Sequence, residues 1–237
     1  MIASVVPDTL VGTNCYVVAP AAGEECLVVD PGFEVLDRLE EVLLALRLRP
    51  AAVLLTHGHA DHVWSVTPVC RASGVPALVH ADDVHRLTDP LAGLSPQLVV
   101  MLEQHFGAAP TWTGPDEVRA LTGASERFSV AGLDLLAEHA PGHTEGSAVF
   151  TLDGVPEGLL DGATAGHLSS TLLAGDVLFA GSIGRTDLPG GDQAAMERSL
   201  RDVVLPMPDD RLVLPGHGGP TTVGRERVTN PHLLALA

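Results

Sequence analysis

Apolar and polar residues alternate along this chain with two different periods, and these periods predict where its strands and helices lie. Short apolar runs bounded by Gly, Pro or charged residues predict β-strands. The run Ala-Ala-Val-Leu-Leu at 51–55 is apolar throughout, which is typical of a strand buried on both faces. All the runs that predict strands are 14–18, 26–29, 51–55, 75–80, 127–130, 133–136, 148–152, 171–174 and 211–214.

Apolar residues at helical spacing separate several of these strands. Over 34–48 they recur at intervals of three and four residues between Glu and Arg side chains, which predicts a helix that Pro50 ends. The apolar positions of this helix are Val35, Leu39, Val42, Leu43 and Leu46. Further helices are predicted over 63–72, 97–106 and 193–204.

Two segments follow neither period. Residues 81–123 contain four prolines and short helical pieces, and they are too apolar for a disordered linker. We expect this segment to cover one edge of the functional site, and whether it moves as a lid stays open. Residues 153–170 are rich in glycine and predict a surface loop. Strands that end in polar loops occur in both halves of the chain, which indicates a weak internal duplication.

The most unusual polar residues follow the apolar run at 51–55. On a strand, His57, His59 and Asp61 would share one face, because side chains repeat every second residue. Gly58 allows the chain to curl, so that the side chain of His62 can join them. Packing such groups together without a cation would be costly, so the spacing predicts a metal site. The full run is Thr56-His57-Gly58-His59-Ala60-Asp61-His62.

Three further candidate ligands follow later strands. A Pro-Gly turn precedes both His143 and His217, and such a turn can aim one imidazole. Asp176 follows the run at 171–174, and a carboxylate at the end of a buried strand needs a partner such as a cation. We expect the remaining histidines of the irregular segments to be surface or packing residues, namely His85, His105 and His167.

The run Thr-His-Gly-His-Ala-Asp-His resembles the T-H-x-H-x-D-H motif of the metallo-β-lactamase superfamily, and the likeness extends along nearly the whole chain. It implies an α+β fold, the αββα sandwich of that superfamily, with two mixed β-sheets face to face and helices outside. We expect a single domain over 1–237, with an insertion or covering segment at about 81–123. The resemblance also implies two metal ions, of which one would take His57, His59 and His143, the other Asp61, His62 and His217, with Asp176 bridging them.

A second motif narrows the resemblance. Gly175-Asp176, then Phe-x-Gly-Ser-x-Gly-Arg-Thr-Asp-x-Pro-Gly-Gly at 179–191, is similar to the glyoxalase II-like branch. This branch includes small bacterial type II glyoxalases and persulfide dioxygenases, and the tail from Pro215 to Leu234 resembles it as well. The typical glyoxalase II has a further C-terminal helical region that grips glutathione. The sequence ends at Ala237 before such a region, so the thiol carrier stays open.

The resemblance implies a metal-dependent hydrolase. Imidazole and carboxylate ligands suit two divalent ions, zinc first, with iron or manganese as alternatives. A metal-bound hydroxide, oriented by Asp61 and Asp176, would attack the acyl carbon of a 2-hydroxyacyl thioester of the S-lactoylglutathione type. The alternative is a persulfide dioxygenase that oxidises glutathione persulfide with one Fe(II), held by His57, His143 and Asp176. A non-catalytic binding module would be expected to lose some ligands, and all seven are present.

Arg185, within the second motif, has two interpretations that both stay open. Its guanidinium would suit a carboxylate at the acidic end of the thiol carrier, which is the role that the resemblance implies. It would equally suit an internal ion pair with Asp187, two residues further along the chain.

Composition limits the partners. The 237 residues include 30 acidic and 13 basic ones, and the formal net charge of −17 argues against a nucleic-acid partner and a nuclease activity. The three cysteines form no C-x-x-C pair, the N-terminus lacks a basic leader, and no apolar stretch has membrane-spanning length. We therefore expect a cytoplasmic protein with a small-molecule thioester as its partner and no membrane contact. A homodimer stays open.

Overall fold

The computed structural model describes residues 1–236 except 93, 95, 108–110, 158 and 160–165. In this described part, twelve strands form two sheets of six, and neighbours within a sheet follow one another in the sequence. The first sheet consists of β1 (Ile2–Pro7), β2 (Asn14–Ala19), β3 (Glu25–Val29), β4 (Arg49–Leu54), β5 (Ala77–His80) and β6 (Val118–Leu121). The second consists of β7 (Ser125–Val130), β8 (Leu133–His139), β9 (Ala148–Asp153), β10 (Ser170–Gly175), β11 (Arg211–Pro215) and β12 (Thr221–Thr222).

Both sheets are mixed. In the first, β1 to β3 are antiparallel, whereas β3 to β6 are parallel. Parallel neighbours need a crossover connection, and α1 (Leu36–Leu46) and α3 (Val66–Ser73) supply two of them. In the second sheet β10 and β11 are parallel, and the other pairs are antiparallel.

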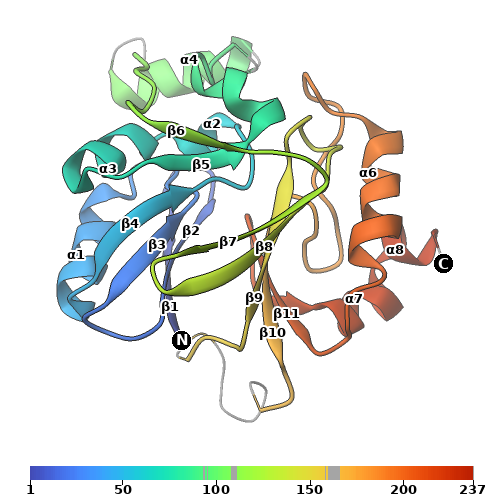
Figure 1. Ribbon diagram of the computed structural model, residues 1–237. Coiled ribbons are helices and arrows are strands. Elements are labelled where there is room, and N and C mark those ends of the chain that lie inside the picture. Colours follow the sequence, from blue (N-terminus) through green and yellow to red (C-terminus); the bar gives the residue numbers. More distant parts are fainter. Residues whose placement is uncertain (93, 95, 108–110, 158, 160–165, 237) are drawn as a thin grey trace.

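The two sheets face each other, and helices cover their outer faces (Figure 1). Leu27 and Leu54 of the first sheet belong to the same buried cluster as Phe150 and Leu173 of the second, which is the core between the sheets. A second cluster packs the first sheet against α1 and α3. A third packs the second sheet against α6 (Gln193–Ser199), α7 (Val223–Thr229) and α8 (Pro231–Leu234). The predicted αββα sandwich is confirmed.

The predicted elements differ from the observed ones in their details. Pro50 does not end the first helix: the chain leaves α1 at Arg47, which has a left-handed backbone with φ of 55°, and Pro50 lies within β4. The helix predicted over 63–72 is α3, which begins at Val66 and ends at Gly74 as a left-handed cap, and a separate short helix, α2 (Ala60–Val63), precedes it. The helix predicted over 193–204 is α6 continued by a π-helical turn, η2 (Leu200–Val204).

The segment at 81–123 contains three described elements. They are a 3₁₀ helix, η1 (Ala81–Leu87), then α4 (Pro96–Phe106), and finally β6, which is the edge strand of the first sheet. Leu102 of α4 packs with Phe33 and Ala60, so this helix lies against the start of α2. Residues 108–110 of this segment and 158 and 160–165 of the predicted glycine-rich loop lie outside the described residues. Within the described part, every helix is too short or too polar to cross a lipid bilayer.

Candidate metal centre

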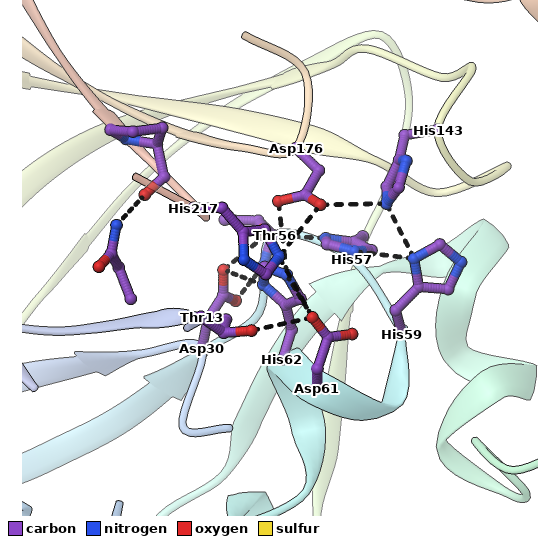
Figure 2. Close-up of polar contacts among 12 residues, drawn as sticks. Thr13, Asp30, Thr56, His57, His59, Asp61, His62, His143, Asp176 and His217 are labelled. Carbon is purple, nitrogen blue, oxygen red and sulfur yellow. Dashed lines mark hydrogen bonds and ion pairs between the residues drawn. The ribbon is translucent and has the colours of Figure 1, made fainter. Parts of the chain in front are cut away.

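The seven predicted ligands meet at one edge of the sandwich, just beyond the C-terminal ends of four strands (Figure 2). His57 and His59 follow β4, and the next two candidates lie on α2. The others follow β8, β10 and β11 in the second sheet. The structure thus brings together all seven side chains, namely His57, His59, Asp61, His62, His143, Asp176 and His217.

His57, His59 and His143 form one group. His59 Nδ1 lies 3.1 Å from His57 Nε2 and 2.8 Å from His143 Nε2. The ring planes meet edge to face, at 85° between His57 and His59 and 87° between His59 and His143. Ring nitrogens that point at one shared position from roughly perpendicular planes are the arrangement that a single ion needs.

Asp61, His62 and His217 form the second group, and Asp176 lies between the two groups. Asp61 Oδ2 is 3.2 Å from His217 Nε2 and 3.5 Å from His62 Nε2. One oxygen of Asp176 is 3.4 Å from His143 Nε2, in the first group, and 3.6 Å from His217 Nε2. Its other oxygen is 3.4 Å from His62 Nε2. A carboxylate placed in this way can bridge two cations.

Contacts at Nδ1 of two imidazoles, those of His62 and His143, orient the rings so that Nε2 faces the centre. Asp30 accepts hydrogen bonds from the backbone N–H and the hydroxyl of Thr56, at 2.8 and 2.6 Å, and lies 3.0 Å from His62 Nδ1. His143 Nδ1 lies 2.7 Å from the backbone oxygen of Arg185. Because Nδ1 of both His62 and His143 is engaged in these contacts, Nε2 is the nitrogen that remains free to face an ion.

Two more residues outside the ligand set hold the ligand loops. The buried carboxylate of Asp83 accepts hydrogen bonds from the backbone N–H of Gly58, from the hydroxyl of Thr144 and from the backbone N–H of Gly146. The buried hydroxyl of Thr13 donates a 2.8 Å hydrogen bond to Asp61 Oδ2. Asp83 therefore links the loops that carry His57 and His143, and Thr13 supports the second group.

The electrostatic setting differs between the two groups. Burial, reinforced by His143, lowers the pKa of His59 to about 2, and burial also lowers the pKa values of His57 and His143. Burial would likewise lower the pKa of His62, but Asp176, Asp61 and Asp30 outweigh it and raise that pKa to about 10. The imidazoles of the first group therefore favour the neutral form, whose lone pairs can bind a cation, while the carboxylates around His62 favour positive charge in the second group.

Two observations test whether the residues fit metal ions. Among the described residues, His62 Nε2 and Asp176 Oδ1 are buried side-chain atoms without a hydrogen-bond partner, and they face the centre of the cluster. Buried polar atoms normally find partners, so these two atoms mark a position that a cation would fill. The backbone also comes close there: a Cβ on Gly216 would lie 2.1 Å from Asp176 Oδ1. The cluster is typical of dinuclear sites, and its donors suit divalent ions.

Arg185 takes part in the internal ion pair that was one of its two interpretations. Its Nε and a terminal nitrogen donate to the two carboxylate oxygens of Asp187 at 2.7 and 2.8 Å, and both side chains are exposed. Arg185 also lines a hollow of about 370 Å³ that opens over the ligands. The apolar part of this hollow is formed by Phe179, Ile183 and Leu188.

A further cluster of candidate ligands lies apart from the centre and consists of His80, Asp82 and His139. Its two imidazoles stack in parallel, with ring centroids 3.8 Å apart and planes at 10°, unlike the edge-to-face rings of the first group. His139 Nε2 lies 2.8 Å from the backbone oxygen of Glu145, and His80 Nε2 lies 3.3 Å from that of Gly123. These contacts give the two histidines a structural role at the ends of β5 and β8.

Asp30, Thr13 and Asp83 are functional-site residues that the sequence pattern did not predict. A signal for Asp30 was present, because it follows the buried strand β3 just as Asp176 follows β10, and the same argument about a buried carboxylate applies to both. Thr13 and Asp83 carry no local signal of this kind, since their partners lie 48 and 61 residues away along the chain.

Fold and site together define a class of metal-binding enzymes with an αββα sandwich and a histidine and aspartate cluster at one edge. A family model described as the metallo-beta-lactamase superfamily matches residues 8–156, more than half of the chain. The chain therefore belongs to the metallo-β-lactamase superfamily, whose enzymes are mostly hydrolases.

Comparisons with individual proteins agree with this membership. An uncharacterized protein of Mycobacterium tuberculosis is 38% identical over 231 residues, which cover 98% of this chain and 97% of that protein. Hydroxyacylglutathione hydrolase GloC of Haemophilus influenzae is 30% identical over 244 residues, covering 97% of this chain and 96% of that protein. The crystal structure of TTHA1623 in a di-iron-bound form has a TM-score of 0.71 and 32% identity, covering 96% of this chain and 98% of that one.

Proposed function

We propose that this protein is a metal-dependent hydrolase that cleaves a thioester of the S-lactoylglutathione type, a 2-hydroxyacyl thiol. The observation that carries the proposal is the position of Asp176 between two complete ligand groups, on the floor of an open hollow. Such a centre has room for two ions, and we infer zinc, with iron or manganese as alternatives. The similarity to GloC supports the thioester class of substrate.

Two bound divalent ions would supply a hydroxide at neutral pH and neutralise the charge that develops on the carbonyl oxygen. The chain's own residues prepare the site for this. Burial alone would raise the pKa of Asp61, but His62, His217 and the Thr13 hydroxyl lower it, so this carboxylate stays ionised. We infer that Asp61 and Asp176, whose carboxylates border the position of the attacking oxygen, orient it toward the acyl carbon. The wall of Phe179, Ile183 and Leu188 would exclude water around the substrate.

Arg185 would contact the thiol carrier in this proposal. It stands at the rim of the hollow, and its pair with Asp187 is exposed, so the pair itself contributes little stability. A substrate carboxylate could replace Asp187 as its partner. We therefore expect Arg185→Gln to raise KM for S-lactoylglutathione with little change in kcat. Arg71→Gln is the matched control, because Arg71 makes a similar exposed pair with Asp116 away from the hollow.

We also infer that the reaction takes place in a reducing compartment such as the cytoplasm. Cys15, Cys26 and Cys70 are buried free thiols. Burial raises the pKa of Cys26 and of Cys70 to about 12, so neither offers a thiolate at neutral pH. Attack by a cysteine is therefore no part of the proposed reaction.

The test is metal content of the purified chain, combined with two assays on the same sample. These assays are hydrolysis of S-lactoylglutathione and oxygen uptake with glutathione persulfide. About two ions per chain together with thioester hydrolysis would support the proposal. One iron with oxygen uptake would replace it by the persulfide dioxygenase, in which His57, His143 and Asp176 hold the ion. The variant Asp176→Asn should lose hydrolytic activity, while Asp187→Asn, which changes an exposed residue outside the ligand set, should retain most of it.

A further inference from the structure

Thr13 lies in the loop between β1 and β2 and touches the metal centre without belonging to its ligand set. Its side chain is fully buried, and its hydroxyl donates the 2.8 Å hydrogen bond to Asp61 Oδ2. The same carboxylate oxygen is 3.2 Å from His217 Nε2. Thr13 thus donates its hydrogen bond to the same oxygen of Asp61 that faces His217 (Figure 2).

The backbone on the N-terminal side of Thr13 is held by the buried carboxylate of Asp8. That carboxylate accepts hydrogen bonds from four consecutive backbone N–H groups, at 2.8 to 3.1 Å. The donors are Leu10, Val11, Gly12 and Thr13. In return, the N–H of Asp8 donates to the backbone oxygen of Thr13 at 2.8 Å. The loop is therefore closed on itself and presents the Thr13 hydroxyl in one position.

On its other side Thr13 is joined to the turn that carries His217. Thr13 and His217 form an isolated antiparallel bridge, and the N–H of Asn14 donates to the oxygen of Gly216 at 2.7 Å. The side chain of Asn14 donates to the oxygens of Pro215 and Gly218. One short segment thus fixes both the backbone that bears His217 and, through the hydroxyl, the carboxylate of Asp61.

We propose that Thr13 is a positioning residue for the second metal ion, which sets the carboxylate of Asp61 against His217. This inference rests on the two-ion centre of the proposed function. A donated hydrogen bond leaves a carboxylate oxygen a lone pair for a cation, and it restricts the rotation of the carboxylate. The hydrogen bond of the Thr13 hydroxyl and its backbone bridge both reach residues of the second group, Asp61 and His217, so we expect its effect to be confined to that group.

If Thr13 served only to pack the loop, a different Zn²⁺ affinity would be expected for its variants. Valine has nearly the shape of threonine but cannot donate a hydrogen bond, so Thr13→Val would keep the packing and lose the bond to Asp61. If Thr13 only filled space, the affinity for both ions would stay unchanged in that variant. Serine keeps the hydroxyl and loses a methyl group, so Thr13→Ser should restore the affinity that valine removes.

The experiment measures Zn²⁺ binding to the full chain by competition with a chromophoric chelator, for wild type, Thr13→Val and Thr13→Ser. We expect the second Zn²⁺ to bind Thr13→Val about tenfold or more weakly, the range found when a partner of a metal ligand is removed. The affinity for the first Zn²⁺ should change less than about twofold. Thr67→Val is the matched control, because the buried hydroxyl of Thr67 donates to the oxygen of Thr113, away from the ligands.

Three results would overturn the inference. If wild type and Thr13→Val bind the second Zn²⁺ with equal affinity, the role of Thr13 is refuted, and the two-ion centre itself is unaffected. Equal weakening of both ions, or weakening that Thr13→Ser does not relieve, would show a general disturbance of the fold instead. Wild-type protein that takes up only one Zn²⁺ would overturn the two-ion centre itself, and the wild-type titration alone would reveal this.

Discussion

The backbone N–H of Gly58 donates a 2.7 Å hydrogen bond to the carboxylate of Asp83, a buried residue 25 positions further along the chain. The same oxygen accepts a hydrogen bond from the hydroxyl of Thr144, and the second oxygen accepts one from the N–H of Gly146. Gly58 separates His57 from His59, and Thr144 follows His143. One carboxylate that is not itself a ligand therefore ties together the two loops of the first ligand group.

Asp83→Asn should disturb this link whichever way the amide turns. The amide nitrogen would face a backbone N–H, either that of Gly58 or that of Gly146, so two donors would meet without an acceptor. We expect a loss of about 1–3 kcal/mol in the free energy of unfolding, measured by urea denaturation, because a buried donor is left unsatisfied. Asp82→Asn is the control, since Asp82 is the exposed neighbour. A stability loss no larger than that of the control would argue against the link.

Gly216 and Gly219 lie in the same turn and make a matched pair for the crowding of the centre. A Cβ on Gly216 would come within 2.1 Å of Asp176 Oδ1 and 2.7 Å of His62 Cε1, whereas one on Gly219 would meet nothing within 4 Å. Gly216→Ala should therefore displace Asp176 and reduce the Zn²⁺ bound per chain, and Gly219→Ala should bind Zn²⁺ as wild type does. Metal analysis after gel filtration measures both. If Gly216→Ala binds as much Zn²⁺ as wild type, the backbone of the turn shifts to accommodate the methyl group and Asp176 stays in place.

The meeting of the seven candidate ligands was predictable from the sequence because their signal is local. Four of them stand within six residues after a fully apolar run, and each of the others lies in a loop that follows a strand. Thr13 and Asp83 were not predictable, since each acts on a residue that only tertiary structure brings near. Asp30 is the instructive case, because the argument that selected Asp176 would have selected it too.

The strands, like the site residues, were predictable where the signal is local and not predictable where tertiary contacts decide the structure. Strands that are apolar on both faces, such as β3 and β4, were found, because each lies between the inner core and a helix layer. β6 was missed because half of its four residues are exposed at the sheet edge, so that it lacks a continuous apolar run. The sequence predicts that Pro50 ends a helix, but Pro50 lies in β4 opposite Cys26, where the register shifts and a missing N–H is tolerated.

His80 gives a prediction for the pH dependence of stability that does not involve the ligands. Burial, together with the stacked ring of His139, lowers the pKa of His80 below its usual value of 6.5. As pH falls below that value, the unfolded chain binds a proton at this residue that the folded chain does not, so stability is lost. Between about pH 7.5 and pH 5.5, metal-free wild type should therefore lose more free energy of unfolding than His80→Gln does.

Urea denaturation at the two pH values measures this difference, and using metal-free protein keeps loss of bound ions out of the comparison. His167→Gln is the control, because His167 is exposed and distant in sequence from the stacked pair. If wild type and His80→Gln lose the same free energy of unfolding on acidification, then His80 takes up its proton as easily in the folded chain as in the unfolded one.

Metal removal should lower the stability of the protein, because the centre contains buried groups that lack hydrogen-bond partners and that a cation would satisfy. His62 Nε2 and Asp176 Oδ1 are buried without a hydrogen-bond partner, and the uncharged first group consists of imidazoles whose nitrogens face one another at 2.8 to 3.1 Å. Zn²⁺ at about one hundred times its dissociation constant should add about 2.7 kcal/mol to the free energy of unfolding for each ion bound only by the folded state. Thermal unfolding with and without added Zn²⁺ should thus show a clear rise in Tm for wild type. His57→Ala, which lacks a first-group ligand, should show a smaller rise, and an equal rise in both would place the stabilising ion away from the first group.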